Sequence, residues 1–343
     1  MANIAPRNIP RFVMAGLAPA IHVDPQTKSG GDEKERNSAN PGTTLIVSDM
    51  GILARRALAA GAMGRVGAVF ERSFYIDLAG RWLCLSALNA PGPLFARFDP
   101  AKLGAVDIRG QISVGDAVEV GETSFRIDGR FEFSTGTART WAPLPLSAWT
   151  QDSLARGLAG LRHIAGERIP REGLGGFILG IEAAEPISRE ARMAAGAVAE
   201  LGDWLGAALS TADPAAPPLS LASLIGLGPG LTPSGDDFLA GVMIAAHALA
   251  RPRVAERLYA KMAPNLARLT HPISAAHLEA AAEGLGSGKL HEILDTILAG
   301  HLKRLPGDLA GLAAIGHSSG WDALAGMVLA LANFDGRGTI LRQ

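Results

Sequence analysis

The sequence predicts an α+β protein, in which a β-rich domain over residues 44–146 precedes a mainly helical domain over residues 147–335 with buried central helices. In the first part, short apolar runs end at Gly-containing turns, as strands do. In the second part, apolar residues recur at helical spacing. The length of 343 residues is enough for about two domains of roughly 150 residues each.

The β-rich part contains the run VGAVFERSFYIDLAGRWLCLSAL from Val66, whose two strand-like halves meet at Ala79-Gly80 and predict a hairpin. Gly115-Asp116 and Asp128-Gly129 are turn dipeptides between further short strands. These features predict a small sandwich or barrel. Cys84 lies in an alternating apolar run and is interpreted as a buried strand thiol, since a single cysteine cannot form an internal disulfide.

Residues 1–43 are predicted to be a disordered N-terminal extension. The segment DPQTKSGGDEKERNSANPGT over residues 24–43 has no large apolar residue that could anchor a core, so it cannot offset its ordering entropy. The preceding run FVMAGLAPAI is short and contains Gly16 and Pro19, which disfavours an export signal.

Composition argues against two classes of partner. The net charge is −1, so no overall field would attract nucleic acid or an anionic membrane, and aromatic residues make up only 5% of the chain. No apolar run reaches the roughly 18 residues that a membrane helix needs. We therefore expect a cytoplasmic protein without nucleic-acid or membrane partners.

Helices are expected from Ser147 onward. The predicted ranges are 153–165, 188–209, 237–250, 252–269, 273–284, 289–303, 306–315 and 322–333. Pro214, Pro217 and Pro218 separate the second range from a Gly/Pro-rich loop over residues 226–235.

An internal repeat links two of these helices. SGDDFLAGVMIAA from Ser234 aligns with SGWDALAGMVLAL from Ser319, an offset of 319 − 234 = 85 residues. Both serines are predicted to cap their helices, with an acidic residue three positions later as in a capping box. The helices are apolar on all sides and should be buried. Gly241 and Gly326 inside them suggest a close helix–helix approach.

The loops before the two repeated helices predict a binding site for a small anion. Glycines let a ligand approach backbone N–H groups, and a helix N-terminus favours negative charge. The predicted binding residues are Gly228, Gly230, Thr232, Ser234, Gly235, Ser318, Ser319 and Gly320, with Ser274 from the start of a helix between the loops. The alternative is that both loops are tight connections before capped helices, with no ligand.

Three residues are candidates for catalysis: Asp237, His317 and Asp322. His317 could protonate a substrate near neutral pH, and Asp322 repeats Asp237. Asp236 and Asp237 could act as a base or bind Mg²⁺ as a cofactor; the alternative is that acidic residues in a first turn only stabilise the helix. No metal site is assigned, because His271 and His277 do not share a helix face.

The segments GLGPGLTPSGDDFLAG and IGHSSGWDALAG, with THPISAAHLEAAAEG between them, resemble the AllH-type family. A weaker likeness in GRVGAVFERSFYIDL, in APGPL and in the tract ending at Trp141 extends the resemblance to residues 45–335. The chain departs from the family at Gly67-Ala68, where members often carry His-Ser.

The resemblance implies a subunit of oxamate carbamoyltransferase, which converts oxalurate and phosphate to oxamate and carbamoyl phosphate in anaerobic allantoin degradation, or the reverse. It also implies partner subunits, one of them similar to a succinyl-CoA ligase, and substrates that are all small anions. Two alternatives stay open: an anion-binding or assembly subunit without chemistry, and a free-standing hydrolase or ligase acting on another ureido acid or carboxylate.

Overall fold

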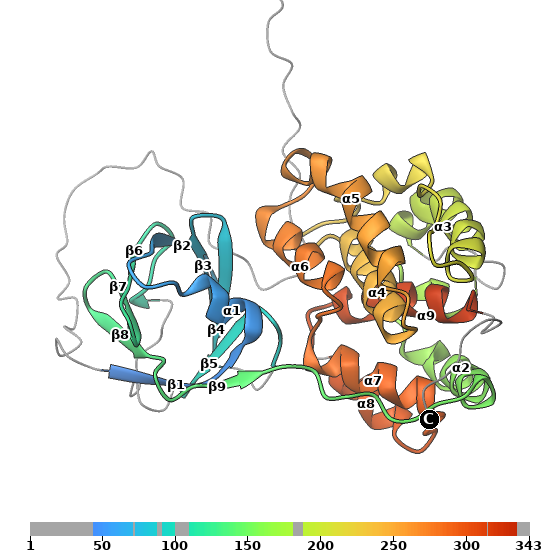
Figure 1. The fold of residues 1–343 in the computed structure, drawn as a ribbon, viewed down its shortest axis with the longest axis horizontal. Helices are drawn as coiled ribbons and strands as arrows, with labels where there is room; N and C mark the ends of the chain where they lie inside the picture. The colour runs from blue at the N-terminus through green and yellow to red at the C-terminus, as the bar shows by residue number, and fades with distance from the viewer. Residues whose placement is uncertain are drawn as a thin grey trace, which may run out of the picture.

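The computed structural model describes residues 44–70, 73–87, 91–99, 110–180, 188–313 and 315–334. The predicted extension over residues 1–43 lies outside the described residues. The described chain has a β-barrel region followed by a helical region, which confirms the predicted α+β class. In Figure 1 the barrel and the helices form two bodies side by side, joined by the segment that follows β9.

The barrel closes because its first strand pairs with several others. The strand order is β5-β4-β3-β2-β6-β7-β8-β1-β9, and an additional β1–β5 pairing joins the ends of the ring. The start of β1 lies parallel to β8 and its middle lies antiparallel to β5, with Val47 opposite Phe98. The strands are β1 Thr44–Gly51, β2 Met63–Val69, β3 Ser73–Leu78, β4 Arg81–Ser86, β5 Phe95–Phe98, β6 Ala117–Val120, β7 Ser124–Ile127, β8 Phe131–Ser134 and β9 Arg139–Trp141, with the short helix α1 Ile52–Ala57 after β1.

Two predicted turns of the barrel are confirmed. Strands β3 and β4 are antiparallel neighbours, and Ala79 and Gly80 between them both have positive φ, as a tight hairpin requires. Asp128 and Gly129 have the same conformation between β7 and β8. Inside the barrel, Phe125 stacks on Phe133 with ring centroids 5.0 Å apart.

The helical region contains the predicted helices with shifted ends. Short 3₁₀ turns, η3 Gly166–Arg168, η4 Gly175–Leu179 and η5 Leu219–Ser223, lie between them. The helices are α2 Gln151–Ala165, α3 Arg189–Ala208, α4 Ser234–Ala248, α5 Pro252–Leu269, α6 Pro272–Ala282, α7 Gly288–Ala299, α8 Leu305–Ala313 and α9 Ser319–Ala332. Helices α4 and α9, which contain the sequence repeat, are buried over most of their length, as predicted.

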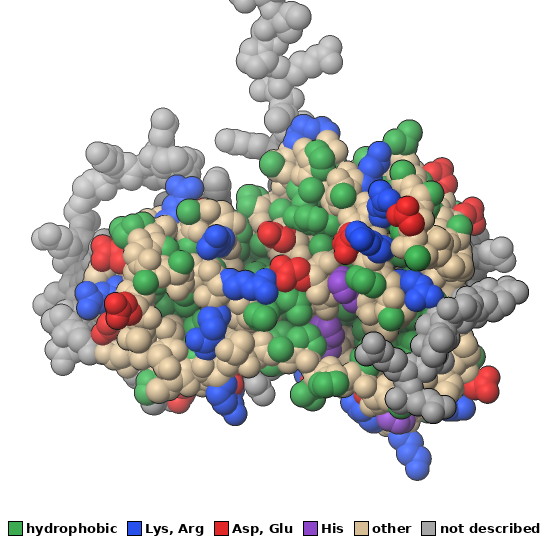
Figure 2. Space-filling view, in the orientation of Figure 1, with side chains coloured by type: hydrophobic (Ala, Val, Ile, Leu, Met, Phe, Trp, Pro, Cys, Tyr) green, Lys and Arg blue, Asp and Glu red, His purple; other side chains and the backbone are tan. Residues whose placement is uncertain are grey.

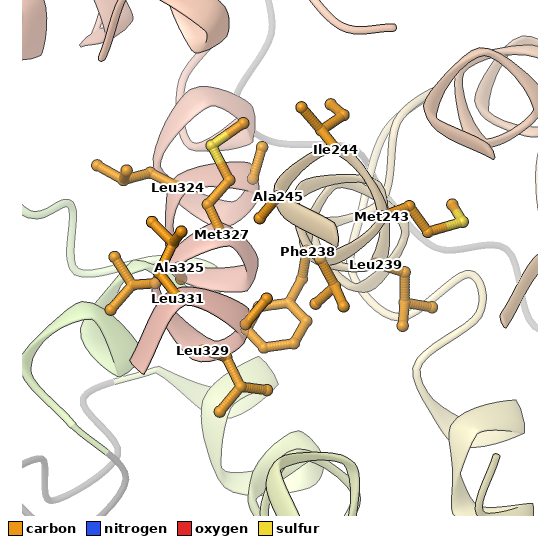
Figure 3. Packing of buried hydrophobic residues seen from close by; sticks show 14 of the residues in the cluster. Phe238, Leu239, Met243, Ile244, Ala245, Leu324, Ala325, Met327, Leu329 and Leu331 are labelled. Carbon is orange, nitrogen blue, oxygen red and sulfur yellow. The ribbon is translucent and has the colours of Figure 1, made fainter. Parts of the chain in front are cut away.

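Helices α4 and α9 cross at two glycines that are equivalent in the repeat. A Cβ on Gly241 would lie 1.8 Å from the carbonyl oxygen of Ala323, and one on Gly326 would lie 1.9 Å from that of Phe238. Because 323 − 238 and 326 − 241 both equal 85, each contact maps onto the other under the repeat. The predicted close approach is confirmed, and Figure 3 shows the Phe238 ring projecting from α4 toward α9.

The two regions are in contact along a seam, which separates two lobes in the space-filling view of Figure 2. Arg56 of α1 forms an ion pair with Glu283, 2.9 Å apart, and the Gly288 N–H donates to the Pro91 carbonyl at 2.7 Å. The face shown in Figure 2 carries interspersed acidic and basic side chains. Within the described ranges, no helix is long and apolar enough to cross a bilayer.

Candidate functional site

The starts of α4 and α9 meet beside the helix crossing. The hydroxyl oxygens of Thr232, in the loop before α4, and Ser319, the first residue of α9, lie 3.1 Å apart and share a hydrogen bond. Both residues keep part of their surface accessible. The two helix starts that the repeat singles out are therefore neighbours in space.

Neither repeated serine caps its helix, so that prediction is wrong. Helix α4 begins at Ser234 with Pro233 as its N-cap, and α9 begins at Ser319 with Ser318 as its N-cap. Neither N-cap residue makes a side-chain capping bond. The proline explains the shift before α4: its extended backbone, φ −57° and ψ 145°, delays helical conformation until the next residue.

Backbone carbonyls already accept from most N–H groups in the first turn of α4. The Gly235 N–H donates to the Leu227 carbonyl at 2.9 Å, and the N–H groups of Asp236 and Asp237 donate to the Pro233 carbonyl at 2.9 and 3.1 Å. The Gly235 N–H, predicted to contribute to an anion site, is therefore already engaged by a backbone carbonyl. An anion at this tip would depend on hydroxyl groups and on the loop before Pro233.

Asp237 and Asp322 each have a buried carboxyl oxygen, Oδ2, without a hydrogen-bond partner in the part of the chain that the structure describes. The two residues are equivalent in the repeat, since 322 − 237 = 85. A buried carboxylate oxygen without a partner is costly, and in natural proteins it calls for a proton, a ligand or a functional role.

The pKa values of both carboxyls are raised, that of Asp237 more than that of Asp322. Burial raises the pKa of Asp237 well above its usual range, and the negative charge of Asp322 raises it further, while the Ser319 and Thr232 hydroxyls oppose the rise. Burial raises the pKa of Asp322 to about 6, against opposition from its hydrogen bond with the Leu174 N–H. At neutral pH the pair therefore binds a proton more strongly than two isolated aspartates would.

Asp322 is held in place by a segment far away in the sequence. Its Oδ1 accepts from the Leu174 N–H at 2.5 Å, and its side chain is fully buried. A Cβ on Gly173 would lie 2.4 Å from that same oxygen, and Gly173 has φ +75°. The Gly173 carbonyl in turn accepts from the Ser188 hydroxyl at 2.5 Å. Only Oδ2 of Asp322 is thus left for a proton or a ligand.

Asp236, next to Asp237, has a structural role. Its Oδ1 accepts from the Gly226 N–H at 2.8 Å, and its Oδ2 accepts from the hydroxyls of Thr270 and of Ser274, the latter at 2.6 Å. These bonds join the Gly-rich loop to the start of α6. Both oxygens of Asp236, considered from the sequence as a base or Mg²⁺ ligand, are therefore engaged within the protein. Ser274, predicted to bind substrate, is buried and donates its hydroxyl to Asp236.

The predicted glycines divide into two groups. Gly228 and Gly230 have φ +109° and +95°, so they shape the loop before α4, where the chain keeps part of its surface accessible. Gly235 and Gly320 serve packing: a Cβ would lie 1.9 Å from the Leu224 carbonyl oxygen in the first case and 2.6 Å from the Leu312 carbonyl oxygen in the second. Gly320 is buried and, like Gly235, does not line the accessible side of the tips.

His317 lies at the outer rim of this region. Its side chain is exposed, and its Nε2 lies 3.2 Å from a carboxylate oxygen of Glu172, which is also exposed. Ser318 and buried Ser234 contribute hydroxyls that favour the ionised form of Asp322. The tips thus bring together Thr232, Ser234, Asp237, Ser318, Ser319 and Asp322.

The arrangement provides two buried carboxyls with raised pKa values and hydroxyl groups that can donate hydrogen bonds to an anion. Among the described residues, no group of three or more His, Cys, Asp and Glu side chains could hold a metal ion. Sequence reasoning missed the contribution of Leu174, because a backbone N–H gives no signal in a sequence. It also missed Asp236 as the link to α6, although Ser274 at the start of that helix was among the predicted binding residues.

The family comparison covers this same part of the chain. Residues 224–331, which begin just after η5 and run almost to the end of α9, match the model of the family described as oxamate carbamoyltransferase subunit AllH. The match includes both helix starts and Asp237 and Asp322. No solved structure matches the chain significantly. In this helical segment, the chain is similar to the AllH-type family.

Proposed function

We propose that this chain is a subunit of a carbamoyltransferase of the oxamate type, and that Asp237 and Asp322 form its acid–base pair. The observation that carries the proposal is the pair of equivalent carboxyls with unpartnered buried oxygens at the meeting point of α4 and α9. Perturbed carboxyls of this kind are concentrated at functional sites. The family description supplies the reaction class.

The proposed reaction requires the chemistry that such a pair offers. A phosphate oxygen attacks the terminal carbonyl carbon of oxalurate, and the bond from that carbon to the amide nitrogen breaks. The departing nitrogen needs a proton, so oxamate leaves as a neutral amide with its carboxylate, and carbamoyl phosphate forms. A carboxyl that stays protonated near neutral pH can donate this proton, and in the reverse direction its conjugate base removes it.

Hydroxyl groups and the Gly-rich loop would hold the anion. Thr232 and Ser319 are the accessible hydroxyls at the tips, and Gly228 and Gly230 give the preceding loop a shape that L-residues rarely adopt. A protonated carboxyl donates to an anion rather than repelling it, so the raised pKa of Asp237 is compatible with an anionic substrate.

A second candidate function is an assembly subunit without chemistry. The engagement of the N–H groups of Gly235 and Asp237 by backbone carbonyls favours it, because it removes donors that an anion would use. In that case the carboxyl pair shares a proton and has no substrate.

The deciding experiment uses the full chain purified together with the subunits encoded beside it. Phosphate-dependent cleavage of oxalurate is measured for the wild type and for Asp237→Asn and Asp322→Asn. Asp152→Asn, an exposed first-turn aspartate of α2, serves as the matched control. Loss of activity in both site variants, with assembly and the control unaffected, supports the acid–base role. Wild-type rates in both site variants would reject it in favour of the assembly role.

A further inference from the structure

The barrel places a tyrosine against the helical region. The Tyr75 hydroxyl, on β3, lies 3.3 Å from Nε2 of His277 on α6, and the two rings meet edge to face with centroids 6.4 Å apart. Tyr75 lies opposite Cys84 of β4, so this part of the sheet faces α6, which contacts β4. A polar pair thus bridges the barrel and the helices at the seam.

The position of α6 puts this pair next to the α4 tip. Ser274 on α6 donates to Asp236 on α4 at 2.6 Å, and His277 follows Ser274 by three residues, which places both on the same side of the helix. Asp237 directly follows Asp236. Consistent with this geometry, the negative charge of Asp237 adds to the effect of burial, the largest cause, in raising the pKa of Tyr75.

The pair is uncharged at neutral pH and is still reachable. Burial lowers the pKa of His277 to about 4, so its imidazole is neutral, and Tyr75 keeps its proton because its pKa is raised. Both residues retain part of their accessible surface. When one member of the pair donates to the other, a second N–H or O–H remains for a third group. A weakly solvated, uncharged donor suits a carboxylate or an amide carbonyl better than a dianionic phosphate.

We infer that the site at the α4 and α9 tips extends across the seam, and that Tyr75 and His277 bind the carboxylate–amide end of a small substrate whose reacting end lies at Asp237. This inference rests on the proposed function and adds to it that the barrel supplies part of the substrate site. It assigns to the Tyr75–His277 contact a role in binding as well as in joining the two regions.

The test uses the two tyrosines of the chain, Tyr75 and Tyr259. The full chain is produced with 3-fluorotyrosine and assembled with unlabelled partner subunits, and its two fluorine resonances are assigned with Tyr259→Phe. Oxamate and inorganic phosphate are then titrated separately. Oxamate should shift the Tyr75 resonance and leave that of Tyr259, on α5, unchanged. Phosphate alone should shift Tyr75 less than oxamate does.

A binding measurement completes the test. Tyr75→Phe removes only the hydroxyl and should weaken oxamate binding by about tenfold, since a hydrogen bond to a charged group contributes on the order of one such factor. Arg56→Gln breaks the exposed ion pair with Glu283 at the same seam and controls for loosening of the interface. It should leave oxamate affinity unchanged.

The outcomes separate this inference from the proposed function. Unchanged affinity in Tyr75→Phe with lost binding in Asp237→Asn would overturn the inference alone. Equal losses of oxamate affinity in Tyr75→Phe and Arg56→Gln would contradict the inference, because Tyr75 would then only hold the two regions together. Failure of oxamate to bind the wild-type assembly would overturn both.

Discussion

Asp237 of α4 and Asp322 of α9 occupy equivalent positions of an internal repeat, and both leave a buried oxygen without a partner where the two helices cross. The glycines Gly241 and Gly326 permit this approach because neither helix could come as close with a Cβ at the crossing. The repeat therefore explains two features together: a glycine-mediated crossing, and a carboxyl pair beside it.

Replacing either carboxyl of the pair by an amide should stabilise the protein near pH 8. Asp322→Asn removes a carboxylate whose charge burial disfavours, so the free energy of unfolding should rise by about 1–3 kcal/mol. Asp237→Asn removes a carboxyl that must bind a proton to stay buried, so it should raise the free energy of unfolding as well. Chemical denaturation at pH 8 measures it. A loss of stability in both variants would contradict this account, because it would mean that the ionised carboxylates have stabilising partners absent from the structure.

The stabilisation should depend on pH with a definite sign. The folded-state pKa of Asp322, about 6, lies above its ordinary value, so the folded protein holds a proton that the unfolded chain releases. The stability that comes from this bound proton is fully present below about pH 4, the pKa of an aspartate in the unfolded chain. It is lost as the pH rises through the pKa of Asp322 in the folded protein. The gain in stability from Asp322→Asn should therefore shrink from pH 8 to pH 5. A gain that grows on acidification would contradict the raised pKa.

Replacing Asp236 by asparagine should destabilise the protein, whereas the same change at its neighbour Asp237 should stabilise it. In Asp236→Asn one oxygen must serve the Gly226 N–H and the hydroxyls of Thr270 and Ser274, and the new NH₂ group would face donors. We expect a loss of about 2–3 kcal/mol in the free energy of unfolding, as for other buried groups left unsatisfied. Measuring Asp236→Asn and Asp237→Asn side by side gives an internal control, because the two residues are adjacent.

The helix crossing should not tolerate a single methyl group. Gly241→Ala or Gly326→Ala would place a Cβ less than 2 Å from a backbone oxygen, and should cost about 3 kcal/mol or more. Gly196→Ala on α3 is the matched control, since a Cβ there meets nothing within 4 Å. The control should gain about 0.5–1 kcal/mol from helix propensity. Thermal denaturation of the three variants checks both signs.

Replacing His317, one of the predicted catalytic residues, should have little effect on the stability of the protein. Its contact with Glu172 is exposed on both sides, and such pairs contribute about 0–1 kcal/mol. The free energy of unfolding of His317→Ala should therefore differ from that of the wild type by no more than this amount, as measured by chemical denaturation. A loss of catalysis in this variant at unchanged stability would mean that the rim histidine approaches the substrate when the complex is assembled.

Features encoded locally could be predicted from the sequence. The hairpin at Ala79-Gly80 depends on a turn that two adjacent residues specify, and the burial of α4 and α9 follows from helices that are apolar on all sides. The repeat predicted that Gly241 and Gly326 would lie at a close approach, because a glycine inside a helix is otherwise unfavourable.

Features that depend on distant partners could not be predicted. The place of strand β1 in the sheet could not be predicted, because its partners, β5, β8 and β9, are far along the chain. Ser234 is a residue type that favours the N-cap position, but the extended backbone of Pro233 makes the proline the N-cap and Ser234 the first helical residue. The partner of Asp322, the N–H of Leu174, is 148 residues away, and its role is independent of its side chain.

The most direct test of the account is the pH–rate profile of oxalurate phosphorolysis by the assembled complex. If Asp237 donates a proton while Asp322 is ionised, the rate should rise through about pH 6 and fall at higher pH, where Asp237 loses its proton. Asp322→Asn should remove the limb near pH 6 and Asp237→Asn should reduce the rate by about 100-fold or more. A profile and a rate in Asp237→Asn identical to those of the wild type would contradict the central claim that this carboxyl pair carries the chemistry.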